Sequence, residues 1–288
     1  YHLTPENLFF MDLRDADRAP LDLKLVKMQN HVLPFPAQFP IGLSYHAVPD
    51  IGSVWGAYMG THMYVDPAGG GQNGDETAYA ITRSAAGKIF VVACGGVKGG
   101  LGAEELQQLT DIAIKYKVNS IGIEKNFGNG ALSSVWQPAL LSQMKEEGLT
   151  CSIEDVWESG QKALRLIDVL EPVIENSKLV VDIDLIDDDW DQCQKYPIQE
   201  RSTYSLFWQM ARITRDKNCL IHDDRLDALA AAVRYWVDLL ALDEKKALVQ
   251  AEQANYQKMI RNPLGMPNAP RSGMLSTNQS TPNRMGIT

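Results

Sequence analysis

The sequence predicts an α/β fold in which helices flank a mixed β-sheet. Three strand-like segments, 61–66, 76–83 and 87–95, follow one another with only short Gly-rich or Ser-Ala-Gly turns between them. Strands joined by such short turns pair as antiparallel hairpins. Beyond residue 100 helical and strand patterns alternate, and strands separated by helices pair in parallel. The two patterns together predict a sheet that is neither purely parallel nor purely antiparallel.

Each predicted element has its own local signal. The helix at 103–116 carries an apolar stripe that runs from Leu106 to Ala113. The segment 118–124 reads V-N-S-I-G-I-E and ends on an acid, as 61–66 does. The remaining predicted elements are helices at about 130–147, 160–176, 203–214 and 224–243, a strand at 149–155 and an edge strand at 179–183.

The two ends of the chain differ from the regular central domain, residues 61–243. Prolines interrupt residues 1–60 at Pro20, Pro34, Pro36, Pro40 and Pro49. Short helices are therefore predicted only at 5–13 and 21–30, and we expect a connector or wrapping arm. Residues 244–288 end in a stretch rich in Pro, Asn, Ser, Gly and Met, which predicts a flexible basic tail.

Composition excludes several classes of protein. The 288 residues carry 27 Lys and Arg against 36 Asp and Glu, a net charge of −9, which argues against a wholly basic nucleic-acid-binding surface. The tail 244–288 carries +4, so the rest carries −13. No apolar run is long enough to span a membrane, and the start does not resemble a secretory signal. The four cysteines lie far apart, which disfavours a zinc site and suits a reducing cytoplasm.

Carboxylates gather at positions that the fold would bring together. Asp66 and Glu124 each end a predicted strand, and these two strands are expected to be neighbours. Acids at 223, 224 and 227 start a helix, where three- and four-residue spacing places carboxylates on one face. Such oxygen ligands suit Mg²⁺ or Mn²⁺, and two ions about 4 Å apart promote phosphodiester cleavage. Taken singly, acids at these positions are more often structural.

The loop after Asp66 contains a G-x-G-x-x-G pattern, residues 69–74. A dinucleotide site requires a helix directly after it, whereas a strand is predicted here. We interpret the loop as one that lets substrate approach Asp66 closely. Asp75, at its end, is a further candidate metal ligand or a solvated turn acid. No phosphate loop for ATP occurs.

Residues 182–191 contain six Asp and no base. The run lacks the glycine and closing glutamate of an EF-hand calcium loop, so we predict a solvated acidic edge. One hypothesis is that this edge repels DNA or docks a basic partner.

Five stretches of the chain, in order between about 60 and 240, resemble the C-terminal nuclease part of large terminase subunits from tailed double-stranded DNA phages, podovirus type. They read V-D-P-A with G-D-E-T, E-K-N-F-G-N-G, D-V-L-E-P-V, Y-S-L-F, and R-I-T-R followed by H-D-D-R-L-D-A-L. The resemblance implies an RNase H-like fold and metal-dependent cleavage of concatemeric viral DNA during packaging. It further implies that Asp66, Glu124 and an acid of 223–227 are catalytic, with Asp227 favoured, then Asp224, then Asp223.

The resemblance also implies two Mg²⁺ or Mn²⁺ ions and a double-stranded DNA substrate that is cut with low sequence specificity. Expected partners are the portal or procapsid and the small terminase subunit. The expected location of the protein is the host cell cytoplasm. The ATPase motor of the family would lie upstream of Tyr1, outside this chain. Candidate DNA contacts are Lys125, Asn126, Lys162, Arg165, Arg215 and Arg225, which could touch phosphates. For Lys162 and Arg165 a solvated helix face is an equal alternative.

Three alternative functions stay open at this point. A junction-resolving or transposase-type nuclease would have the same fold and prefer branched DNA. A non-catalytic module that docks on a portal would have no carboxylate-dependent metal site. A nucleotide-binding ATPase of related fold is disfavoured by the missing phosphate loop.

Overall fold

A computed structural model describes eight stretches of the chain, residues 3–13, 17–39, 42–68, 76–99, 102–125, 131–158, 160–216 and 218–261. Residues Tyr1–Ala241 form one compact unit, which contains the sheet and the candidate site. In the described part of the chain no helix is long and apolar enough to cross a membrane.

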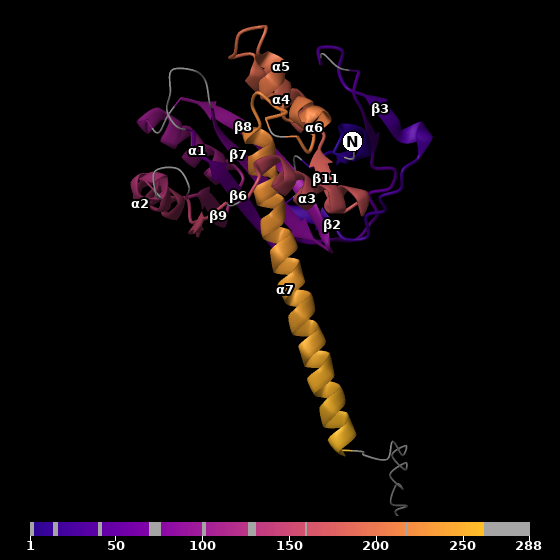
Figure 1. Ribbon diagram of the computed structural model, residues 1–288. Coiled ribbons are helices and arrows are strands. Elements are labelled where there is room, and N and C mark those ends of the chain that lie inside the picture. Colours follow the sequence, from indigo (N-terminus) through magenta and orange to yellow (C-terminus); the bar gives the residue numbers. More distant parts are fainter. Residues whose placement is uncertain are drawn as a thin grey trace, which may run out of the picture. The chain divides into compact units, whose positions relative to one another are not determined.

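The fold is built on a nine-stranded sheet that is mixed, as the sequence predicts, and five of its strands form the centre (Figure 1). These five strands are β6 (Gly60–Asp66), β7 (Glu76–Ala85), β8 (Lys88–Lys98), β9 (Ser120–Glu124) and β10 (Ser152–Val156), in the order β10-β9-β6-β7-β8. Strands β6, β7 and β8 are antiparallel, whereas β9 and β10 run parallel to β6. Ala86 and Gly87 join β7 to β8 with φ of 48° and 72°, and positive φ at both positions is typical of a tight hairpin.

Strand β11 and three strands of the N-terminal segment extend this sheet. Four strands continue it beyond β8 in the order β11 (Leu179–Asp182), β1 (Phe9–Met11), β4 (Ser44–Ala47) and β3 (Val32–Pro34). The strand predicted at 179–183 is therefore interior rather than an edge. The helix predicted at 5–13 is wrong, because a short helical turn at Pro5–Asn7 leads into β1. Phe10 and Met11 of β1 are buried in the cores on opposite faces of the sheet, which is typical of a covered parallel strand.

Smaller elements complete this region. They are a two-stranded sheet of β2 (Arg18–Pro20) and β5 (Trp55–Ala57) and a second helical turn at Gln29–His31, in place of the helix predicted at 21–30.

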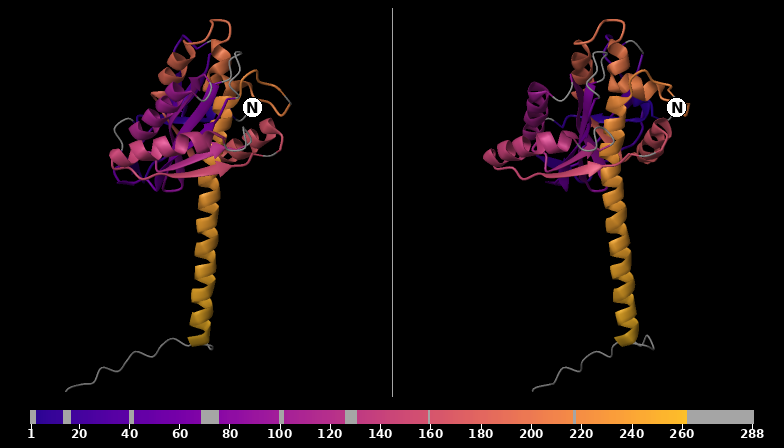
Figure 2. Two further views of the ribbon diagram at one scale, coloured as in Figure 1. Left: turned by 90° about the vertical axis from the view of Figure 1, so that its left-hand side faces the viewer. Right: turned by 60° about the vertical axis from the view of Figure 1, so that its left-hand side comes forward.

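Helices cover both faces of the central strands (Figures 1 and 2). On one face, Leu109 of α1 (Ala103–Lys115) and Trp136 of α2 (Ala131–Glu146) pack with Met63 and Val65 of β6. On the other face, Leu170 of α3 (Lys162–Glu175) and Leu229 of α7 (Asp224–Arg261) pack with Tyr64. Side chains alternate along a strand, so Tyr64 and Asp66 share the face that α3 and α7 cover.

The acidic run is mostly helical, and three of its six acids, Asp187, Asp188 and Asp191, are exposed as predicted. Its residues end β11 and build α4 (Leu185–Cys193), which is followed by α5 (Arg201–Tyr204) and α6 (Leu206–Arg212). Asp189 is completely buried, and its carboxylate accepts hydrogen bonds from Ser205 Oγ and Leu206 N at 2.6 and 2.9 Å. This acid therefore belongs to the interior rather than to a solvated surface, and it has the several donors that a buried carboxylate needs. The tail from residue 262 lies outside the described residues, and α7 is helical to Arg261.

Candidate metal centre

Two adjacent strands place the first two carboxylates. Strands β6 and β9 pair in parallel, with Val65 opposite Ile123, so Asp66 and Glu124 follow at the same end of the sheet. Parallel neighbours bring their carboxyl ends to one edge, where a side chain after each strand can meet the other. Asp66 is buried, whereas Glu124 is half-buried.

The third carboxylate comes from α7, about 100 residues later along the chain. Asp227 lies in the first turn of this helix and is buried. One oxygen from each of Asp66, Glu124 and Asp227 lies within 4.8 Å of the others. Three carboxylates at this separation form a donor set that suits a hard divalent cation.

A lysine lies among these acids. Lys162, in the first turn of α3, points its Nζ to within 2.8 Å of Asp223 Oδ1 and 3.1 Å of Asp227 Oδ2. It is also 3.8 Å from Asp66 Oδ2 and 3.8 Å from Asp224 Oδ1. Burial lowers the pKa of Lys162, but the surrounding carboxylates outweigh burial and raise it above its ordinary value. Lys162 therefore brings a positive charge to the cluster.

The electrostatics of Asp66 indicate a site built for more positive charge. Burial raises the pKa of Asp66 well above its ordinary value, and the proximity of Glu124 and Asp227 adds to this, while Lys162 opposes it. Like charges at short distance disfavour ionisation of the whole set. The donor set therefore fits a divalent cation, because such a cation would relieve the repulsion that one lysine leaves.

Arg165, one turn after Lys162, also faces the cluster. Its Nη2 donates to Asp227 Oδ1 and Oδ2 at 2.8 and 2.9 Å, and its Nε lies 3.2 Å from Glu158 Oε2. Glu158 is buried and also pairs with Arg234. Burial lowers the pKa of Arg165, but the acids around it raise the pKa above its ordinary value. Arg165 thus fixes the orientation of the Asp227 carboxylate.

Arg225 is buried and therefore cannot make the DNA contact that was predicted for it. Its side chain is fully buried, with Nε 2.5 Å and Nη2 3.1 Å from the two oxygens of Glu76, and Nη1 2.9 Å from Asp189 Oδ1. Burial raises the pKa of Glu76, but Arg225, Lys195 and Tyr196 together hold it below its ordinary value. This ion network fixes the start of α7 to β7 and α4, and so places Asp227 opposite Asp66.

Sequence reasoning missed this network, and only a weak signal could have indicated it. Glu76 opens a strand whose other residues are mostly apolar or small, which is an unusual place for a solvated acid.

The other predicted site residues differ in their contacts and in their distance from the cluster. Asp223 and Asp224 belong to the cluster through Lys162. Lys125 follows Glu124, and its Nζ lies 3.6 Å from Asp155 Oδ2. Arg215 has a side chain that is 62% exposed, and it lies 3.3 Å from Glu171. Asp75 and Asn126 lie outside the described residues.

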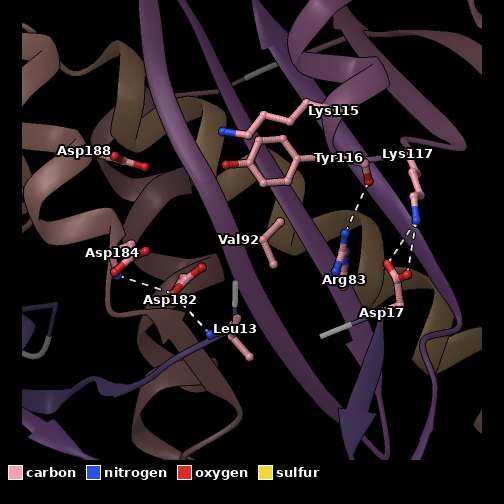
Figure 3. Close-up of a pocket in the computed structure, with 10 residues that line it drawn as sticks. All are labelled: Leu13, Asp17, Arg83, Val92, Lys115, Tyr116, Lys117, Asp182, Asp184 and Asp188. Atoms are coloured by element: carbon pink, nitrogen blue, oxygen red, sulfur yellow. Dashed lines mark hydrogen bonds and ion pairs between the residues drawn. The ribbon is translucent and has the colours of Figure 1, made fainter. Parts of the chain in front are cut away.

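A separate cavity of about 470 Å³ lies between the end of α1 and the start of α4 (Figure 3). Lys115 and Tyr116 face Asp184 and Asp188 across it. Asp182, at its floor, accepts hydrogen bonds from the backbone N–H groups of Leu13 and Asp184. Burial raises the pKa of Asp182 to about 6 in spite of these two donors. None of the predicted site residues that the structure describes lines this cavity.

Comparisons with known proteins agree with this architecture. A family model described as "Terminase Bacteriophage T7, Ribonuclease H-like domain" matches residues 65–179. The large terminase subunit of Enterobacteria phage T3 is 30% identical over 251 residues, which are 87% of this chain. The chain spans 42% of the length of that relative.

Solved structures of low identity also match. The human cytomegalovirus terminase nuclease domain, Mn soaked and inhibitor bound, matches with a TM-score of 0.42 and 12% identity, over 62% of this chain and 83% of that chain. The nuclease domain of the large terminase subunit of bacterial virus Sf6 matches with a TM-score of 0.40 and 14% identity, over 62% and 90% of the two chains.

Proposed function

Since this chain contains the RNase H-like nuclease domain of a terminase large subunit, we propose that it is a divalent-metal-dependent endonuclease that cuts concatemeric viral DNA during genome packaging. The observation that carries the proposal is the meeting of Asp66, Glu124 and Asp227, from three separate elements, with oxygens within 4.8 Å of one another. Carboxylates so close repel one another, Lys162 and Arg165 offset only part of their charge, and this geometry suits phosphodiester chemistry.

Asp66, Glu124 and Asp227 would hold Mg²⁺ or Mn²⁺, with Asp223 and Asp224 as further ligands, and two ions are proposed. When bound, such ions lower the pKa of a water nucleophile and neutralise charge on the phosphate and on the departing oxygen. The chain's own residues then have distinct tasks. Arg165 holds both oxygens of Asp227 and so fixes the direction from which this carboxylate reaches the site.

Lys162 has a task that its four carboxylate contacts define. Its ammonium compensates part of the negative charge of the cluster and keeps the carboxylates together before ions bind. The buried pair of Arg225 and Glu76 lies outside the cluster of candidate ligands. It holds in place the helix that carries Asp227.

The substrate and partners follow from the family and belong to the same proposal. We propose double-stranded DNA cut with low sequence specificity, since no helix-turn-helix or zinc-finger motif is present in the sequence. The portal or procapsid and the small terminase subunit are the proposed partners. The proposed compartment is the host cell cytoplasm.

A cleavage assay tests the proposal. The purified chain is incubated with supercoiled plasmid in Mg²⁺, in Mn²⁺ and in excess chelator, and with a branched junction and linear duplex of equal length. We expect nicked and linear plasmid with either ion, none with chelator, and no preference for the junction. A strong preference for the junction would instead favour a resolving or transposase-type nuclease, and the absence of cleavage together with the absence of metal binding would favour a docking module.

A further inference from the structure

A row of stacked rings leads away from the candidate metal centre. His222, the residue before Asp223, stacks on Tyr204 with ring centroids 3.9 Å apart, and Tyr204 stacks on Tyr196 at 3.6 Å. Tyr196 Oη donates to Glu76 Oε2 at 2.6 Å, and Glu76 begins β7. The row therefore joins the segment before α7 to the central sheet.

The strand register places the far end of this row near the carboxylates. Asp66 of β6 pairs with Ala78 of β7, and Ala78 pairs with Gly96 of β8. Residues directly opposite each other share a face, so Gly96 lies on the face of Asp66, two strand spacings or about 10 Å away. The carboxylate of Glu76 lies over Gly96, where a Cβ of that residue would be. The row thus ends on the same face and at the same edge of the sheet as Asp66.

Two lysines lie at the Tyr196 ring, at this end of the row. Lys98 comes two residues after Gly96 in β8 and so lies on the same face, and its Nζ is 5.3 Å from the ring centroid. Lys195 Nζ is also 5.3 Å from the centroid, lies 3.5 Å from Glu76 Oε2, and donates to Gly96 O. Lys98 is exposed, and the side chain of Lys195 is 30% exposed.

Arg201 brings a third cation to Tyr196. Its Nε donates to Tyr196 O at 2.9 Å, and its Nη2 donates to Gln194 O at 3.3 Å. Two carbonyl oxygens hold the guanidinium in place, and they leave its charge intact because they are neutral. We use the name basic surface for Lys98, Lys195 and Arg201.

The basic surface carries more charge than the buried network beneath it requires. Arg225 and Lys195 already match the two buried carboxylates of that network. Lys98 and Arg201 add positive charge beyond this balance. By contrast, Lys125 and Arg215, which the sequence analysis predicts as DNA contacts, each lie within 4 Å of a carboxylate. The basic surface is therefore better suited to hold an external anion near the metal centre.

We propose that the basic surface binds the phosphate backbone of duplex DNA on one side of the cleavage point. Each strand of a duplex advances by about 3.4 Å per phosphate, so a separation of about 10 Å reaches the third phosphate from the one at the metal centre. Contacts to the backbone fix the register of the duplex without reading its sequence, as low sequence specificity requires. The inference rests on the proposed nuclease function for its substrate, but it concerns binding, which can be measured without cleavage.

Duplex binding in excess chelator tests the inference, because no cleavage is expected there. The full chain, Lys98→Met, the double variant Lys98→Met with Arg201→Met, and the control Lys88→Met are titrated with fluorescent duplexes of two unrelated sequences. Lys88 begins the strand that Lys98 ends, about 33 Å away. Between about 50 and about 200 mM salt, each phosphate contact accounts for a loss of affinity of about 3.5-fold. Over this range the parent should lose about 3.5-fold more affinity than Lys98→Met and about 12-fold more than the double variant, on both sequences. Lys88→Met should follow the parent.

Cleavage kinetics give a second readout. In Mn²⁺, Lys98→Met should raise KM for plasmid with little change in kcat, because a phosphate contact is made equally in the bound and the transition state. Circular dichroism melting confirms that each variant is folded.

Three results would overturn the inference. They are the salt dependence of the parent in both Lys98→Met and the double variant, no measurable duplex binding by the parent at about 50 mM salt, and a lower kcat with unchanged KM. The first result would also indicate that the basic surface serves a protein partner. A chain that binds duplex as expected but cuts no plasmid would refute the nuclease proposal and leave the basic surface as a DNA-binding one.

Discussion

One nitrogen of Arg165, Nη2, donates to both carboxylate oxygens of Asp227, at 2.8 and 2.9 Å. The two residues are 62 positions apart in the sequence, on α3 and α7, so this contact joins two helices at the place where the carboxylates meet. It also joins Asp227 to Glu158, which Arg165 contacts through Nε. Asp227 is therefore held in one direction before any ion or substrate arrives.

Replacing Arg165 by Met should loosen the orientation of Asp227, which then keeps only Lys162 as a charged partner among the described residues. Loss of a group that orients a metal-ligating carboxylate typically costs 10- to 100-fold in metal affinity. We expect a weakening of about that size in Mn²⁺ binding, measured by calorimetry, together with slower plasmid cleavage. Arg215→Met is the matched control, since Arg215 is mostly exposed and pairs only at the surface with Glu171. If both variants bind Mn²⁺ like the parent, Arg165 has no orienting role.

Replacing Asp66 by Asn should abolish cleavage and preserve the fold. Burial raises the pKa of Asp66, and Glu124 and Asp227 repel its charge, so a neutral amide removes a repulsion. We expect the melting temperature in chelator to equal or exceed that of the parent, while plasmid stays intact in Mg²⁺ and Mn²⁺. Circular dichroism melting and an agarose gel measure the two effects. Full cleavage by this variant would contradict the proposed function.

Replacing Arg225 by Met should destabilise the fold, because the buried carboxylates of Glu76 and Asp189 lose their counter-charge. Removing one partner of a buried ion pair costs about 3–5 kcal/mol. Urea unfolding should show a loss of that order. Neutralising all three positions, Arg225→Met with Glu76→Gln and Asp189→Asn, should restore part of the stability. A loss in Arg225→Met no larger than that of an exposed arginine, below about 0.5 kcal/mol, would be inconsistent with the network.

The local sequence pattern was sufficient to predict most strands of the central sheet. Short turns between 61 and 95, and the helix–strand alternation after them, predict the strand directions that the structure shows. Because Asp66 and Glu124 end neighbouring strands, their proximity followed from topology alone. The choice of Asp227 came from the resemblance to large terminases, since periodicity leaves three acids of 223–227 equivalent.

The rest depends on contacts between distant segments. Arg225 and Glu76 are 149 positions apart, and nothing in either local sequence indicates that they pair. The short apolar run at β1 fits a helix or a buried strand equally well. It is a strand because it pairs with β11 on one side and with β4 on the other. Likewise, the helical period of α3 does not indicate whether Lys162 faces solvent or carboxylates. The packing of α3 beside α7 determines it.

The cavity between α1 and α4 gives a prediction about pH. The ordinary pKa of an Asp is 3.8, and burial raises that of Asp182 to about 6. The folded state therefore binds a proton more tightly than the unfolded state, so this residue stabilises the fold below about pH 4 and the stabilisation is lost as pH rises to about 6. Asp182→Asn cannot ionise, and its amide oxygen can still accept from Leu13 N and Asp184 N.

The free energies of unfolding of Asp182→Asn and of the parent should consequently diverge with pH. The free energy of unfolding of the variant minus that of the parent should increase by about 2–3 kcal/mol between about pH 4 and about pH 7.5. Urea titrations of both proteins at several pH values measure this, and the other acids cancel because both proteins carry them. Parallel curves from pH 4 to pH 7.5 would mean that Asp182 ionises in the folded protein as it does in the unfolded chain.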